Sequence, residues 1–117
     1  MREQPHPVVT EADVGRIVRR DFPPEAWRQV EADLSEYGSE SWHPEVNRVR
    51  AAVLKLADGD TNRLRDVVAL ALRDYRDVLA GAEYPAYDRV GWDGAAMEKE
   101  AAIIADWAQY QQWFQRA

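Results

Sequence analysis

The sequence predicts a single all-α domain, and three observations indicate this fold class. Residues with high helix propensity (Ala, Leu, Glu, Lys, Arg and Gln) fill 56 of the 117 positions, whereas the β-branched Val, Ile and Thr fill 17. No stretch alternates apolar and polar residues over more than a few positions, so we expect no β-sheet. Apolar residues instead recur at helical spacing between Gly, Pro and Asp breakers. We therefore expect one compact bundle of about five helices.

The first two helices are expected at 11–21 and 24–37. Thr10 and Asp13 have the spacing of a capping box, in which two side chains satisfy the free backbone N–H groups of a helix start. A pair of prolines then separates the helices, because proline cannot continue one helix but fits the first turn of the next. Gly38 suits the C-terminal cap of the second helix.

Two further helices, at 44–57 and 62–80, are expected to be antiparallel neighbours because the turn at 58–61 is short. The turn reads Asp-Gly-Asp-Thr, which supplies both a stop for one helix and an N-cap for the next. The helix at 62–80 has the widest apolar face of the chain. It should therefore lie at the centre of the bundle.

The segment 81–93 is expected to be a loop, because it holds too much Gly and Pro for a helix, although it carries three large aromatic residues. Asp93 would cap a last helix at 94–115. Four large residues share one face of that helix: Ile103, Trp107, Tyr110 and Phe114. Trp113 falls outside this stripe. We expect the helices at 24–37, 44–57, 62–80 and 94–115 to form the bundle.

The chain is expected to be one domain over residues 1–117, with the polar residues 1–9 mobile. A chain of this length can bury about two thirds of its unfolded surface, which supports a core without covalent staples. No segment occurs twice, and no linker or low-complexity tract divides the chain. Because cysteine is absent, disulfides and thiolate chemistry are excluded.

Charge and hydropathy argue against several classes of partner. The net charge is −6 and no part of the chain is basic, whereas binding to nucleic acid depends on neutralising phosphates. The same charge disfavours an anionic membrane surface, and no apolar run approaches the roughly 18 residues of a membrane span. The N-terminus lacks the features of a secretory signal, so we expect a cytoplasmic protein.

No catalytic, cofactor-binding or metal-binding residue can be named from the sequence. Glu40 and His43 have the Glu-x-x-His spacing of helical metal sites, but Gly38 and Pro44 flank them and no second copy completes a pair. We expect His43 to be a packing residue at a helix entry. Gly-rich phosphate loops and the Gly-x-Ser-x-Gly elbow are also absent. We therefore expect no cofactor and no metal.

Aromatic residues are the best sign of a binding surface in this sequence. Five Trp residues are present, and Trp and Tyr are over-represented at binding hot spots. The three aromatics that follow the period of the last helix, Trp107, Tyr110 and Phe114, are assigned to the core. The candidate partner surface consists of four others: Tyr84, Tyr87, Trp92 and Trp113.

Two blocks of the sequence carry a family resemblance. Leu54–Asp60 reads Leu-Lys-Leu-Ala-Asp-Gly-Asp, and Asp74–Pro85 reads Asp-Tyr-Arg-Asp-Val-Leu-Ala-Gly-Ala-Glu-Tyr-Pro. With these blocks the chain resembles a family of small uncharacterised bacterial helical proteins over about a third of its length. The resemblance implies a compact helical protein of bacterial origin and implies no activity or ligand. The helix pair is also similar to a single HEAT-type repeat, but a solenoid needs about three.

Two functional hypotheses follow. The first is a small interaction or regulatory module without catalytic activity, which binds another protein or a second copy of itself through 81–93 and the exposed side of the last helix. The alternative is a small-molecule-binding or enzymatic helical bundle. Its pocket would be lined by Tyr37, Trp42 and Tyr75 around an acidic pair such as Asp21 with Asp74.

Overall fold

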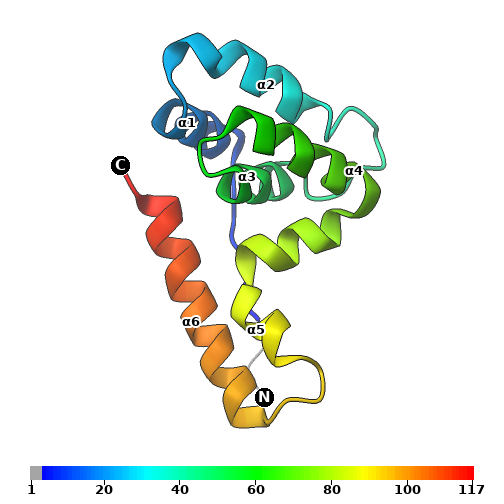
Figure 1. Ribbon diagram of the computed structural model, residues 1–117, viewed down its shortest axis with the longest axis vertical. Helices are drawn as coiled ribbons and strands as arrows, with labels where there is room; N and C mark the ends of the chain where they lie inside the picture. The colour runs from blue at the N-terminus through cyan, green and yellow to red at the C-terminus, as the bar shows by residue number, and fades with distance from the viewer. Residues whose placement is uncertain (1–3) are drawn as a thin grey trace.

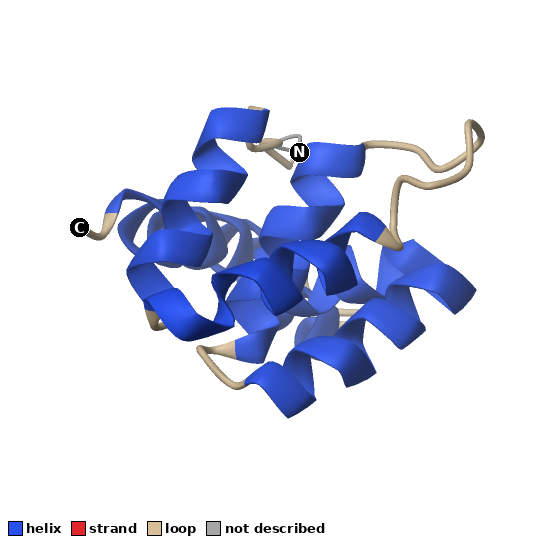
Figure 2. Cartoon of the chain, turned by 90° about the horizontal axis from the view of Figure 1, so that it is seen from above, coloured by secondary structure: helices blue, strands red, loops and turns tan. Residues whose placement is uncertain are grey.

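Six α-helices and one 3-10 turn follow one another in residues 4–117, the part of the chain that the computed structural model describes (Figure 1). Figure 2 shows that the described chain consists of helices and loops, with no strand. The predicted all-α fold is therefore confirmed. The elements are α1 (Glu11–Asp21), η1 (Pro24–Ala26), α2 (Trp27–Ser35), α3 (Val46–Ala57), α4 (Thr61–Glu83), α5 (Pro85–Val90) and α6 (Ala96–Gln115).

The start of α1 has the predicted capping box. The backbone N–H of Asp13 donates to the Thr10 hydroxyl at 3.1 Å, and the backbone N–H of Thr10 donates to the Asp13 carboxylate at 2.9 Å. Val14, Ile17 and Val18 form the buried face of α1. These local interactions explain why the predicted bounds of this helix agree with the structure.

The connection between α2 and α3 differs from the prediction. The helix expected at 24–37 is a 3-10 turn followed by α2, which ends at Ser35, and α3 begins at Val46 rather than at 44. Gly38 has a φ of +105°, and a Cβ at this position would lie 2.7 Å from Val46 and from the Arg50 guanidinium. Glycine is required here because a side chain would have both an unfavourable backbone conformation and a steric clash.

The α3–α4 hairpin is the centre of the core. On α3, the fully buried side chains are Val49, Ala51, Ala52, Val53, Leu54 and Ala57. The helix ends with Asp58 in a left-handed conformation (φ +50°), and the Asp60 carboxylate then accepts the backbone N–H groups of Asn62 and Arg63 at the start of α4. As predicted, α4 is central: it packs against α2, α3, α5 and α6.

Asp74 divides α4 into two helical halves. Its backbone is non-helical, with φ −156° and ψ +91°, and its carboxylate accepts the backbone N–H of Arg76 at 3.1 Å. An extended residue whose side chain accepts this N–H is an N-cap, so Asp74 caps the second half of the helix. The helix expected to stop at about 80 thus changes direction at Asp74 and continues to Glu83.

The segment 81–93 is largely helical, so the prediction of a loop there is wrong. Residues 81–83 complete α4, and Pro85 begins α5 at a position where its missing N–H costs nothing. The Asp106 carboxylate of α6 accepts the backbone N–H groups of Ala86 and Tyr87 at 3.0 and 2.9 Å. This cap comes from about 20 residues farther along the chain, and therefore a local reading of the segment does not reveal it.

The last helix lies beside the α1–α4 body, and its Tyr110 and Trp113 belong to the same core as the buried residues of α1–α4 (Figure 1). It begins at Ala96 and packs mainly against α5 and α4. Its buried residues are Ala102, Ile103, Asp106, Tyr110 and Trp113, so the core side includes Trp113 as well as part of the predicted stripe. Within residues 4–117, no helix is long and apolar enough to cross a membrane.

Two arginines of α1 hold the C-terminal end of α6. Arg20 donates to the carbonyl oxygens of Trp113 and Arg116 at 2.8 and 3.0 Å, and Arg16 donates to that of Phe114 at 2.8 Å. The last carbonyls of a helix have no intrahelical partner and carry partial negative charge. The two guanidinium groups supply both the missing hydrogen bonds and the opposite charge, and so fasten α6 to α1.

Candidate functional site

The four residues of the predicted partner surface do not form one exposed surface. Trp92 is 88% exposed, in the loop between α5 and α6, whereas Trp113 is 8% exposed beneath the guanidinium of Arg20. Tyr84 and Tyr87 are half-buried and meet edge to face, with their ring centroids 6.3 Å apart. The expectation that Trp113 lies on the open side of the last helix is therefore wrong.

The alternative pocket around Tyr37, Trp42 and Tyr75 is not assembled around an acidic pair. The Tyr37 hydroxyl donates to the carbonyl of Pro44 at 2.7 Å, and Trp42 is 69% exposed. Asp21 lies against Arg20 at 2.7 Å, while Asp74 caps the second half of α4. The two carboxylates thus have separate structural roles.

His43 has the packing position that the sequence predicts. Its ring stacks on Tyr37 at 4.7 Å between centroids, and Trp42 meets its edge at 4.4 Å. Its Nδ1 accepts the backbone N–H of Gly38 at 2.8 Å. Among the described residues, no three His, Asp or Glu side chains lie close enough together to hold a metal ion.

A buried polar cluster, which the sequence did not indicate, lies where α3, the end of α4 and α6 meet. Arg48 and Glu83 form a bidentate ion pair, with N–O distances of 2.8 and 2.6 Å. Glu83 is 7% exposed and Asp106, nearby on α6, is 5% exposed. The hydrogen bonds from Arg48 to Glu83 raise the pKa of Arg48, although burial acts in the opposite direction. Such a pair holds its elements in register because separating the charges would leave one buried alone.

Tyr110 is the least exposed of the aromatic side chains of α6. It is 2% exposed and its ring packs against Trp107, Trp113 and Phe114, with centroid distances of 6.4, 5.4 and 5.9 Å. Burial and the nearby Glu83 carboxylate raise the pKa of its hydroxyl. Within residues 4–117, that hydroxyl is buried and has no hydrogen-bond partner. It lines a small cavity of about 10 Å³, shared with Tyr84 and Trp107.

The N-terminal segment forms part of the wall of this cavity. Residues 4–9 have no regular secondary structure, and run from α1 toward the α5–α6 end of the molecule (Figure 1). Gln4, Pro5 and Pro7 line the cavity opposite Tyr84, Trp107 and Tyr110. The predicted mobility of residues 1–9 stays a prediction, and residues 1–3 lie outside the described part.

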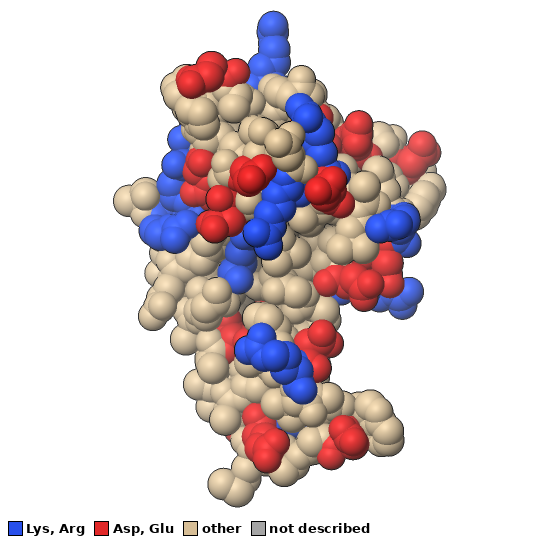
Figure 3. All heavy atoms as spheres, viewed as in Figure 1, with Lys and Arg blue, Asp and Glu red and all other residues tan. Residues whose placement is uncertain are grey.

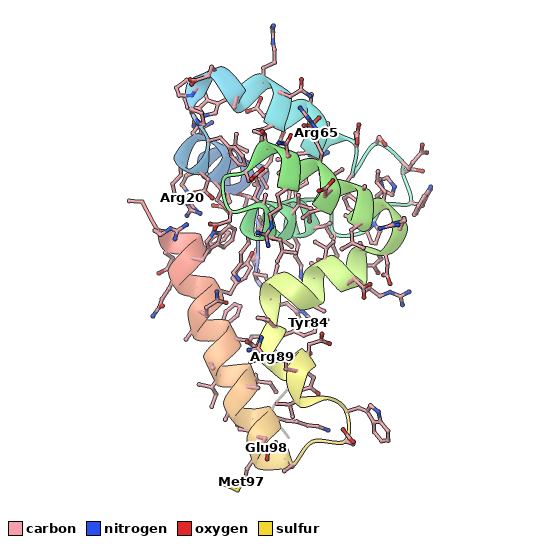
Figure 4. The ribbon with its side chains drawn as sticks, viewed as in Figure 1. Arg20, Arg65, Tyr84, Arg89, Met97 and Glu98 are labelled. Atoms are coloured by element: carbon pink, nitrogen blue, oxygen red, sulfur yellow. The ribbon has the colours of Figure 1, made fainter. Side chains whose placement is uncertain are left out.

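The outward side of α6 is apolar although it faces solvent. Met97 is 86% exposed and Ile104 is 48% exposed. Figure 4 shows Met97 at the end of α6 away from Arg20, and Figure 3 shows few charged atoms over the flank formed by α6. We define the outer face of α6 as five exposed residues: Met97, Ala101, Ile104, Ala105 and Ala108. The sequence held the signal for this face, because these positions repeat at helical spacing without a charge.

No family model, curated protein or solved structure matches this chain. The resemblance to a bacterial helical family therefore stays a prediction.

Proposed function

We propose that this protein is a small interaction or regulatory module without catalytic activity, and that it binds another protein or a second copy of itself through the outer face of α6. The observation that carries the proposal is the exposure of Met97 and Ile104, at 86% and 48%, on a helix face without charged residues. Bacterial origin and a cytoplasmic location are parts of the same proposal.

The composition of this face differs from what a solvated helix needs. A surface helix normally has one apolar stripe toward the core and charged residues on the other side. In α6 the inward side already contains Ile103, Tyr110 and Trp113, yet the outer face is also apolar. Although 31% of the residues in this chain are charged, none of these five exposed positions holds a charge. Exposed apolar surface of this kind is typical of interaction sites.

The small residues on this face favour a helix as the partner element. Ala101, Ala105 and Ala108 leave little bulk on the surface, so the backbone of a partner helix can approach closely. A face without charge also limits repulsion, which matters for a chain with a net charge of −6. These two properties suit either an apolar helix of another protein or the same face of a second copy.

Site-specific photo-crosslinking tests the proposal. A photoreactive phenylalanine derivative replaces Ala101 on the outer face in one variant and Ala69, an exposed alanine of α4, in a matched control. We expect the Ala101 variant to form a defined adduct with one protein or with a second copy, and the Ala69 variant to form none. An additional Ile104→Lys substitution should remove the adduct, because it places a charge in the middle of the contact.

The chain must remain folded for this comparison, which a thermal melt of each variant establishes. Adducts of equal yield from Ala101 and Ala69, or an adduct that survives Ile104→Lys, would contradict the proposal. An adduct between two copies would identify self-association as the mode of binding.

A further inference from the structure

The groove between the end of α4 and α6 is lined by aromatic rings and holds part of this chain. Tyr84 contributes from the end of α4, and Trp107, Tyr110 and Phe114 contribute from α6. Pro7 of the N-terminal segment lines two hollows, and both also have Trp107 and Tyr110 in their walls. The structure therefore already contains an example of what fits there.

The seated segment has a distinctive chemistry. Residues 4–9 read Gln-Pro-His-Pro-Val-Val, with two prolines and no acidic residue. Each proline fixes its own φ near −65° and disfavours a helical conformation in the preceding residue, so this short stretch is restricted to extended conformations. Extended proline-containing peptides are commonly recognised in grooves with aromatic walls, since the peptide loses little conformational freedom on binding.

Hydrogen bonding between the segment and the groove is incomplete. The Tyr110 hydroxyl and the Gln4 side-chain amide nitrogen are both buried beside the same cavity, and neither has a hydrogen-bond partner within residues 4–117. An extended proline-containing peptide has backbone carbonyls that are not used internally. A peptide that places one carbonyl at the Tyr110 hydroxyl would satisfy a donor that the chain's own segment leaves unsatisfied.

We propose that this groove binds an extended, proline-containing peptide without acidic residues, and that residues 4–9 occupy it in competition with that peptide. The chain's own segment acts as an intramolecular cover, which an external peptide displaces. Acidic residues are disfavoured because Glu83 and Asp106 line the cavity and the chain has a net charge of −6. This groove involves a different face of α6 from the outer face, so the inference is independent of the proposed function.

The first test weakens the cover and measures binding of its own sequence. The probe is a fluorescein-labelled peptide with the sequence of residues 4–9, and its anisotropy is measured against the full chain and against the full chain with Pro5→Ala and Pro7→Ala. A site that is covered most of the time loses apparent affinity in proportion to its open fraction. We therefore expect the double variant to bind the peptide at least about tenfold more tightly than the unchanged chain.

Variants of the groove test the site itself. In the Pro5→Ala, Pro7→Ala background, Tyr110→Phe removes only the hydroxyl, and Trp107→Ala removes one wall. We expect peptide affinity to fall at least about tenfold with Trp107→Ala, because the wall supplies most of the apolar contact, whereas Tyr110→Phe should leave the affinity for this probe nearly unchanged, because residues 4–9 make no hydrogen bond to that hydroxyl. Trp92→Ala, which changes an exposed ring outside the groove, is the matched control and should leave the affinity unchanged. A probe in which both prolines are alanine should also bind more weakly.

Two outcomes would overturn the proposal. One is a lack of any difference in affinity: the unchanged chain and the double proline variant bind the peptide equally well, or the double proline variant binds the proline and alanine probes equally well. The other is a dimer, seen by light scattering, that dissociates in the double proline variant, because the segment would then belong to a second copy. A thermal melt establishes whether the Trp107→Ala variant is folded. The comparison between the unchanged chain and the double proline variant does not require the Trp107→Ala variant.

Discussion

Arg20 binds Trp113 in two ways at once. Its Nη1 donates to the Trp113 backbone carbonyl at 2.8 Å, and its guanidinium carbon lies 5.2 Å from the centroid of the indole ring. The first contact caps the C-terminal end of α6, and the second is a cation–π interaction that covers the ring. Figure 4 shows Arg20 on α1 beside this end of α6. The pair joins two helices that are about 90 residues apart in the sequence.

Loss of this contact should weaken the whole fold. We expect Arg20→Gln to lower the free energy of unfolding by about 2 kcal/mol, because it removes a charged donor to the part-buried Trp113 carbonyl together with the ion pair to Asp21. Urea denaturation checks this value. Arg19→Gln is the matched control, since Arg19 is exposed on the same helix and should change stability by less than about 0.5 kcal/mol. Equal effects of the two substitutions would show that the contact with α6 adds no stability.

The Arg48–Glu83 pair should be far more costly to break than a surface pair. Glu83→Gln leaves the Arg48 guanidinium, which is 14% exposed, with the exposed Glu45 carboxylate at 3.5 Å as its remaining counter-charge, and we expect a loss of about 3 kcal/mol. Asp33→Asn is the control, because it breaks an ion pair whose arginine, Arg65, is 54% exposed, and it should cost less than about 1 kcal/mol. Thermal or urea unfolding measures both.

A double substitution separates the pair from the penalty of an isolated charge. Arg48→Met with Glu83→Leu removes both charges and keeps apolar volume in their place. We expect it to recover most of the stability that Glu83→Gln loses, because replacing a whole buried ion pair by apolar residues is often neutral. A double variant as unstable as Glu83→Gln would show that the pair makes a net contribution of its own.

Two glycines should respond to alanine with opposite signs. At Gly38 the positive φ of +105° and the 2.7 Å approach to Val46 predict that Gly38→Ala destabilises the fold by about 1–3 kcal/mol. At Gly81, which is helical, a Cβ would lie at an ordinary 3.6 Å from Leu56, so Gly81→Ala should stabilise by roughly 0.5–1 kcal/mol. Urea denaturation of both variants provides the comparison, and effects of the same sign would contradict it.

Alkaline pH should unfold the protein partly through Tyr110. Burial raises the pKa of its hydroxyl, so the unfolded chain loses this proton at a lower pH than the folded chain does. The stability that the group contributes is therefore fully present below its ordinary pKa of 10.0 and declines as the pH rises above that value. One such group gives a slope of about 1.4 kcal/mol per pH unit.

The Tyr110→Phe variant isolates this contribution. Unfolding free energies of the variant and the unchanged chain are measured in urea from pH 8 to pH 11. We expect the decline above pH 10 to be less steep in the variant, because one of the titrating groups is absent. Burial also raises the pKa of Tyr37 and Tyr84, so some decline should remain. Identical slopes for both chains would contradict the assignment to Tyr110.

Sequence reasoning succeeded where structure depends on nearby residues. The capping box of Thr10 and Asp13, the cap at Asp60 and the apolar face of α4 all lie within single helices or tight turns. The fold class and the central position of α4 could be predicted from them. The outer face of α6 was not predicted, although its pattern of Met, Ile and Ala is visible in the sequence alone.

The predictions that were wrong depend on residues far apart in the chain. Gly81 is helical and faces Leu56, which would lie 3.6 Å from a Cβ added at this position, and α5 is capped by Asp106. Trp113 lies outside the expected stripe of α6 and is nevertheless buried, because Arg20 reaches it from α1. None of these partners is adjacent in sequence, so no local periodicity or turn signal can reveal them.

The break at Asp74 has a consequence for how the molecule opens. In a continuous helix, backbone hydrogen bonds form one cooperative ladder, but here the backbone N–H of Arg76 ends its ladder on a side chain. The amide protons in the half of α4 before Asp74 can therefore exchange with solvent at the same rate as those of the α1–α3 body. Those in the half after Asp74 can exchange at the same rate as those of α5 and α6. Hydrogen exchange should thus show two levels of amide protection within α4, one on each side of Asp74. Contacts such as Arg48–Glu83 connect the second half of α4 to the α1–α3 body.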